Sequence, residues 1–464
     1  MAKHKAGSVQ AAQRMLDFIE EAPSPFHACA AMRNRLARAG FVNLPEGQPW
    51  EVRPGGAYYT TRNNSSIIAF KVGAELDNYH FQLTASHSDS PTYKIKANPE
   101  LSGPAGYIRL DVEAYGGVMD HSWFDKPLSV AGRVMVREGA RVESRLFAPD
   151  ADLLIIPRVP IHLDREANSG FAPNRAVDLC PLFSAGEHSA GAFDKMVAAG
   201  VGAKPANVLA RDLYLVNREQ PRIWGLRDEF VSAPRLDDLA CAYISLEAFL
   251  AADNAHDVSV FCCFDNEEVG SNTKQGAMST LLVDTLSRIN AALGKAPEDL
   301  QCALAKSMLV SCDNAHAVHP NHPERYDEVN RVQLNRGLVV KEAANQKYCT
   351  DAFSRAVFEA VCADAKVPLQ AYANRSDMPG GSTLGNLSNM QVSMHGVDVG
   401  LPQLAMHSSY ETAGARDVDL GIAALKAFYN ADLQIDGADA AQVGESPKQG
   451  LLKSIFAGKS ERAN

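Results

Sequence analysis

The feature that most constrains the fold is a change of pattern near residues 95 and 230. Outside this stretch, apolar runs such as VSVFCCF (258–264) alternate with segments of helical period such as SAPRLDDLACAYISLEAFLAA (232–252). Inside it, short β-rich runs such as LSVAGRVMV are separated by Gly/Pro turns. Alternation of strand and helix is typical of an α/β fold. We therefore predict an α/β domain formed by residues 1–94 and 231–464, interrupted by an inserted β-rich domain at residues 95–230.

Smaller elements are expected on both sides of the insertion. Two helices between about residues 8 and 40 are separated by the prolines of APSPFHA, and SIIAFKV and HFQLTASHSDS are expected to be consecutive strands. Further helices are predicted near residues 351–366 and 418–431. The C-terminal segment containing DGADAAQVGESPKQG is predicted to be weakly ordered.

Composition excludes several classes of protein. The net charge of −10 argues against a general nucleic-acid binder. No window of 18 uncharged apolar residues is present, so no transmembrane helix is predicted, and the N-terminus has an amphipathic helical pattern rather than that of a signal peptide. The nine cysteines are scattered without a CxxC pair, which indicates reduced thiols and a cytoplasmic protein.

Side chains that can bind metals gather where predicted strands give way to loops. In α/β sheets, the crevice at the strand ends is where sites are usually formed. The segments are ASHSDS with His87 and Asp89, PRLDDL with Asp237 and Asp238, DNEEVGS with Glu267 and Glu268, SCDNAHAVHPN with Asp313, His316 and His319, and AMHSSYE with His407.

Each of these residues also has a structural interpretation. His87 and Asp89 share one face of a strand, as a metal ligand and its carboxylate partner would, but they could equally be a polar strand end. Asp237 could be a helix N-cap, Asp313 a turn residue and His407 a core histidine. The metal-site prediction therefore rests on the whole set.

The named candidate ligands are histidines and carboxylates, which favour a borderline metal such as zinc, cobalt or manganese. Two ions about 3.5–4 Å apart would form a co-catalytic hydrolase site. One carboxylate would have to bridge them, and another would have to stay off the metals to accept a proton from water. The adjacent Glu267 and Glu268 could divide these tasks between ligand and base if the chain turns after the strand.

The segments SHSDSP, SAPRLDDL, DNEEVGS, DNAHAVHPN, MPGGSTLG and PQLAMHS occur in an order that closely resembles the aspartyl aminopeptidases, the M18 family of metallopeptidases. The similarity runs from SPFHA to PQLAMHSSYE. It implies a mixed-sheet metallopeptidase catalytic domain with an inserted β-rich dimerisation domain. It also implies a dodecameric tetrahedral shell that removes N-terminal Asp or Glu from peptides.

The resemblance further implies a role for individual residues. His87 and Asp313 would hold one of two divalent ions, most simply zinc, Glu268 and His407 would hold the other, and Asp237 would bridge them. The resemblance also implies that Glu267 is the general base and acid and that Asp89 is the partner of His87. Glu267, Asp313 and His316 would contact the substrate, and Lys341 would face its acidic side chain. His162 would reach the active site of a neighbouring subunit.

Some alternatives remain open. Without the resemblance, Lys341 would be interpreted as a solvated lysine and His162 as an ordinary histidine. His319, His322 and the MPGGSTLG loop receive no role. The competing functions are a related dinuclear exopeptidase or amide deacylase with another side-chain preference, and an inactive self-assembling shell protein.

Overall fold

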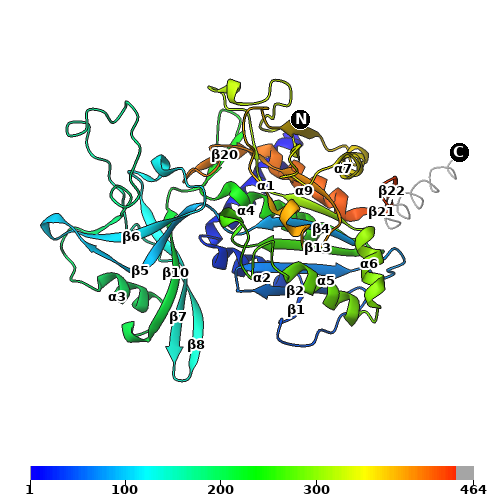
Figure 1. Cartoon of the computed structure of the whole chain (residues 1–464), viewed down its shortest axis with the longest axis horizontal. Helices are drawn as coiled ribbons and strands as arrows, with labels where there is room; N and C mark the ends of the chain where they lie inside the picture. Colours follow the sequence, from blue (N-terminus) through cyan, green and yellow to red (C-terminus); the bar gives the residue numbers. More distant parts are fainter. Residues whose placement is uncertain (1, 446–464) are drawn as a thin grey trace.

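A nine-stranded mixed sheet organises the larger part of the molecule (Figure 1). The computed structural model describes residues 2–445. The strand order is β1-β2-β3-β13-β4-β14-β18-β16-β17. The bounds are β1 Val42–Asn43, β2 Ala57–Arg62, β3 Ser66–Val72, β4 Phe81–His87, β13 Val258–Phe264, β14 Met308–Cys312, β16 Leu338–Glu342, β17 Leu369–Ala373 and β18 His395–Gly400. The predicted mixed-sheet α/β class is confirmed.

Helices cover both faces of this sheet because its central strands are apolar on both faces. In β3, Ile67 and Ala69 belong to the core on one side, whereas Ile68 and Phe70 belong to the core on the other. The first core includes residues of α1 Ala2–Glu21, α2 Pro25–Arg38, α4 Leu236–Ala251, α7 Ala352–Asp364 and α9 Ala415–Asn430. The second includes residues of α5 Leu281–Ala292, α6 Pro297–Ala305 and α8 Leu384–Ser388. Among residues 2–445, no helix is long and apolar enough to cross a membrane.

A second sheet is formed by strands between residues 92 and 217 and lies to the left of the first in Figure 1. Its order is β8-β7-β10-β5-β6-β9, and it encloses a core of its own together with α3 Ala192–Gly200. The strands are β5 Thr92–Ser102, β6 Ile108–Tyr115, β7 Leu128–Glu138, β8 Arg141–Phe147, β9 Leu182–Ser184 and β10 Val208–Asn217. The division into a discontinuous catalytic domain and a dimerisation domain stays a prediction.

A smaller sheet, β11-β12-β20-β19-β15, carries loops of the candidate site. Its strands are β11 Arg222–Trp224, β12 Phe230–Ala233, β15 Ala315–His316, β19 Pro402–Leu404 and β20 Glu411–Gly414. The chain passes from β12 into α4, and the loop between β19 and β20 contains His407.

The C-terminal segment is more regular than its composition suggests. Strands β21 Ala431–Asp436 and β22 Ala440–Glu445 pair in antiparallel register. Leu433 and Ile435 are buried in the first core, which explains why this hairpin forms despite its polar turn. The prediction of weak order is therefore wrong for residues 436–445, and its remaining part lies outside the described residues.

Candidate metal centre

Three neighbouring parallel strands bring the first site residues together. Strand β4 pairs with β13 on one side and with β14 on the other, with Phe264 opposite His87 and Ser311 opposite Ala85. All three strands therefore end at the same edge of the sheet. His87 ends β4, the paired glutamates follow β13, and Asp313 follows β14.

The side chains form three overlapping groups of potential ligand atoms, which are His87, Asp237, Asp238 and Asp313; Asp237, Glu268 and His407; and His87, Glu267 and Glu268. In the first, His87 Nε2 lies 3.5 Å from Asp237 Oδ1 and 3.8 Å from Asp313 Oδ1. In the second, His407 Nε2 lies 3.5 Å from Asp237 Oδ2 and 3.4 Å from Glu268 Oε2. The two oxygens of Asp237 thus face different histidines, as a bridging carboxylate requires.

The first two groups fit divalent cations. Ligand atoms placed about 2.0–2.1 Å from a tetrahedral ion are roughly 3.3–3.4 Å apart, close to the separations in both groups. Asp237 Oδ1 and Glu268 Oε1 are buried and accept no hydrogen bond from any described residue. Buried carboxylate oxygens without a donor are costly, and a cation would satisfy both.

Glu267 and Glu268 separate because the chain turns after β13. Asn266 adopts a left-handed conformation with φ 64° before the 3-10 turn Glu267–Val269. The Glu268 side chain is 4% exposed, against 14% for that of Glu267, whose Oε2 lies 3.9 Å from His87 Nε2. Burial, followed by the negative charges of nearby carboxylates, raises the pKa of Glu267 to about 8.

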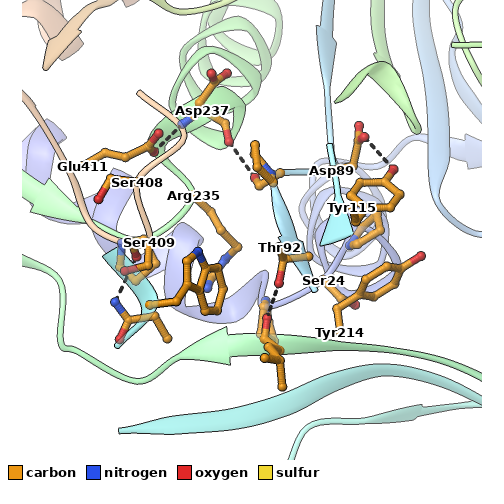
Figure 2. Close-up of a pocket in the computed structure, with 18 of the residues that line it drawn as sticks. Ser24, Asp89, Thr92, Tyr115, Tyr214, Arg235, Asp237, Ser408, Ser409 and Glu411 are labelled. Carbon is orange, nitrogen blue, oxygen red and sulfur yellow. Dashed lines mark hydrogen bonds between the residues drawn. The ribbon is translucent and has the colours of Figure 1, made fainter. Parts of the chain in front are cut away.

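Asp89 connects this turn to His87. Its Oδ1 accepts a hydrogen bond from Glu267 N at 3.1 Å, and its Oδ2 accepts one from Glu268 N at 3.2 Å. His87 Nδ1 lies 3.0 Å from the main-chain oxygen of Asp89 and 3.4 Å from its Oδ1. Asp89 also faces Tyr115, whose hydroxyl donates to Oδ2 at 2.7 Å (Figure 2). Asp89 can therefore orient both a ligand and the base.

Two further buried carboxylates support the site: Asp238, which was named as metal-capable but given no role, and Glu411, which was not predicted. Asp238 accepts hydrogen bonds from His87 N at 3.0 Å and Asn314 N at 3.2 Å. Glu411 accepts them from Asp237 N at 3.0 Å (Figure 2) and His407 N at 2.7 Å. Both lie within quoted motifs, but no residue spacing distinguishes them from surface acids.

The charges of the site favour occupancy by cations. Burial opposes a charged His87, but the carboxylates of Asp238 and Asp237 outweigh it and raise the pKa of this imidazole well above its usual value. The pKa of His407 is raised to about 9, because Asp237 outweighs the effect of burial. Metal-binding imidazoles must lose these protons, so cations and protons compete for the site.

A model of one peptidase family matches nearly the whole chain. It is described as Aminopeptidase I zinc metalloprotease (M18) and matches residues 18–429. The chain belongs to the M18 family. This M18 aminopeptidase is 41% identical over 429 residues to the Probable M18 family aminopeptidase 2 of Clostridium novyi, covering 91% of this chain and 99% of that relative.

Solved structures support the same assignment. A chain in the cryo-EM structure of the Ape4 and Nbr1 complex has a TM-score of 0.88 and 35% identity, covering 92% of this chain and 86% of that one. A chain of the S. cerevisiae mApe1 dodecamer has a TM-score of 0.80 and 26% identity, with coverages of 90% and 96%. The fold of this chain therefore agrees with its assignment to the M18 family.

Beside the ligand groups, the M18 aminopeptidase has a cavity that contains Lys341. This side chain is buried, and its Nζ donates to the main-chain oxygens of Asp313 at 2.8 Å and Asn314 at 3.4 Å. Burial disfavours its charge, but Asp313 and other negative groups outweigh burial and raise its pKa. Lys341 is thus a buried cation rather than a solvated lysine. The cavity is also lined by His316, Tyr348, Tyr372, Gly381, Ser382 and Thr383.

The other histidines considered in the sequence, His162, His319 and His322, do not line this cavity. His162 is exposed on a loop of the segment that carries the six-stranded sheet and does not line the cavity of its own chain. His319 and His322 lie near each other with ring centroids 5.2 Å apart, and neither lines the cavity. Tyr348 in a loop and Tyr372 in β17 were not predicted to line the cavity, because nothing in the sequence around a tyrosine shows that it faces a cavity.

Proposed function

We propose that this M18 aminopeptidase is an aspartyl aminopeptidase that uses two divalent cations, most simply zinc, with cobalt or manganese as alternatives. The observation that carries the proposal is the placement of Asp237 between His87 and His407 in the same cavity as the buried Lys341. His87, Asp237 and Asp313 would hold one cation, and Asp237, Glu268 and His407 would hold the other.

When bound, the two cations would polarise the scissile carbonyl and increase the acidity of water. Glu267 lies beside the ligand groups and is more exposed than Glu268. It would accept a proton from the attacking water and then return that proton to the leaving amine. Asp89 would hold the Glu267 main chain in place for both transfers.

Lys341 supports the preference for acidic N-terminal residues. Two main-chain carbonyls fix its ammonium, and its remaining N–H can donate to a carboxylate in the cavity. His316 at the same cavity would contribute to substrate contacts. An apolar side chain would give the remaining N–H of this buried ammonium no acceptor, which is costly.

A panel of aminoacyl-anilides together with metal analysis tests this proposal. We expect about two divalent ions per chain and faster turnover of the Asp and Glu anilides than of the Leu or Ala anilides. A preference for Leu or Ala would favour the related exopeptidase, and cleavage of N-acyl amides alone would favour the deacylase. Full metal content without hydrolysis of any compound would favour the inactive shell.

We also propose that the chain forms a cytoplasmic homo-oligomer, most simply a tetrahedral dodecamer. The similarity to a chain of the S. cerevisiae mApe1 dodecamer supports this assembly. The exposed His162 would then reach a neighbouring subunit's site. Light scattering should give the mass of twelve chains, and His162→Ala should reduce turnover without changing that mass.

A further inference from the structure

Tyr115 links the six-stranded sheet to the metal centre and has no part in the proposed proton transfers. It ends β6, and the antiparallel register of β5 and β6 places it opposite Thr92. Since β5 begins shortly after Asp89, this hairpin returns Tyr115 to the start of the insertion. Its hydroxyl there donates to Asp89 Oδ2 at 2.7 Å (Figure 2).

A second hydrogen bond to the Tyr115 hydroxyl makes this hydroxyl the donor in its bond to Asp89. Asn266 Nδ2 donates to the Tyr115 hydroxyl oxygen at 2.7 Å, which leaves the phenolic proton for Asp89. Asn266 Oδ1 in turn accepts from Thr273 Oγ1 at 2.9 Å and Gln275 Nε2 at 2.7 Å. Each donor therefore has an acceptor along one ordered chain, and such chains strengthen their members cooperatively.

The residues after Tyr115 touch the metal centre as well. Gly117 O lies 3.0 Å from His407 Nδ1 and can accept its proton, which leaves Nε2 facing Asp237 and Glu268. At Gly116, where φ is +78°, an added Cβ would lie 3.1 Å from Glu268 Cβ. The backbone of the inserted segment therefore packs directly against residues from the second ligand group.

We infer that Tyr115 is a positioning residue of the metal centre, supplied by the inserted sheet. Its hydrogen bond fixes the Asp89 carboxylate, whose two oxygens accept hydrogen bonds from Glu267 N and Glu268 N. It thereby also holds the Asp89 main-chain oxygen that lies against His87 Nδ1. Groups that orient metal ligands in this way typically change metal affinity or activity by about 10- to 100-fold when removed. The inference rests on the proposed metal-dependent function.

Tyr214 provides a matched control. It lines the same cavity as Tyr115, and the two rings meet edge to face with centroids 5.4 Å apart. Among the described residues, its hydroxyl has no hydrogen-bond partner within the site. Tyr115→Phe and Tyr214→Phe remove the same atom from neighbouring rings, so a difference between them reports the hydrogen bonds of the Tyr115 hydroxyl to Asp89 and Asn266 rather than packing.

The experiment compares the zinc-loaded full-length protein with both variants. We expect Tyr115→Phe to lose zinc to a chelator about 10- to 100-fold faster than the wild type. Its kcat on the best aminoacyl-anilide should fall with little change in KM, and its native mass should stay unchanged. Tyr214→Phe should match the wild type in all measurements.

Equal zinc loss and equal kcat in the two variants would overturn the role of Tyr115. A loss of native mass in Tyr115→Phe alone would also overturn it, because the residue would then act through assembly. Failure of the wild type to retain zinc, cobalt or manganese would instead refute the proposed metal-dependent function. The two failures are distinguishable because zinc release is measured without substrate.

Discussion

Glu267 and Glu268 are adjacent in the sequence but have different surroundings. Glu268 is almost fully buried near His407, whereas Glu267 is more exposed near His87. Glu267→Gln removes the proposed proton acceptor while keeping the shape of the side chain. We expect kcat to fall by about 10²- to 10⁴-fold with metal content unchanged. Steady-state kinetics with metal analysis measures both quantities, and near-wild-type turnover would remove Glu267 from the mechanism.

Glu268→Gln should have the complementary effect. An amide is a poorer ligand than a carboxylate, so we expect the second ion to be lost at low metal concentration and activity to be partly restored by excess metal. Metal content as a function of free zinc tests this expectation. Full metal retention with lost turnover would reverse the roles of the two glutamates.

Protons should compete with metal at the histidines. The pKa of His407 is raised to about 9, chiefly by Asp237, and the neighbouring carboxylates raise that of His87 as well, so both shifts favour the protonated imidazoles when no metal is bound. Metal affinity should therefore rise as pH approaches 9, by about tenfold per pH unit for each proton displaced. Calorimetric titration at pH 7 in buffers of different ionisation enthalpy measures proton release, and zero release would contradict the expectation.

The candidate ligands named from the motifs lie close together in the structure, whereas the supporting residues Tyr115 and Glu411 were not named. His87, Asp237, Glu268, Asp313 and His407 meet in two adjacent groups, as expected of a set located at strand ends. Tyr115 could not be predicted, because only the pairing of β5 with β6 brings it to Asp89. The roles of all these residues stay predictions until they are measured.

At the scale of elements, β18 holds the loop after β14 by close backbone contact. Asp313 N donates to Val399 O at 3.0 Å, and a Cβ added to Gly400 would lie 1.9 Å from Asp313 O. Gly400→Ala must therefore displace the main chain of a proposed ligand. We expect a loss of about 1–3 kcal/mol of stability and weaker metal binding, measured by denaturant unfolding and zinc titration.

Gly47→Ala is a suitable control for this substitution, because its added Cβ would meet no atom within 4 Å. It should leave both stability and metal affinity near the wild-type values. Unchanged zinc affinity in Gly400→Ala would show that β18 does not position Asp313.

Individual strands could be predicted from their apolar runs, but their order could not. The run at β13 inserts between β3 and β4, antiparallel to the first and parallel to the second. Apolarity on both faces shows that a strand is central without showing which strands are its neighbours. The hairpin of β21 and β22 was missed because its polar composition outweighs the alternation of Leu433 and Ile435.

At the scale of the whole molecule, metal removal should destabilise the protein. A ligand that binds only the folded state stabilises it by about 4 kcal/mol at a thousandfold excess over its Kd. Without cations, Asp237 and Glu268 remain close and buried, and burial raises the pKa of Glu268. We expect EDTA to lower Tm by several degrees and zinc to restore it, as measured by calorimetry; an unchanged Tm would contradict this linkage.

The proposed ligands are spread along the chain from His87 to His407, with the inserted sheet between the first two of them. During synthesis, a ribosome must therefore complete the insertion and most of the segment from residue 231 to residue 464 before the last ligand can join the others. A nascent or prematurely terminated chain would lack His407 and would be unable to form the second group. The second ligand group can therefore form only after the chain has been synthesised through residue 407.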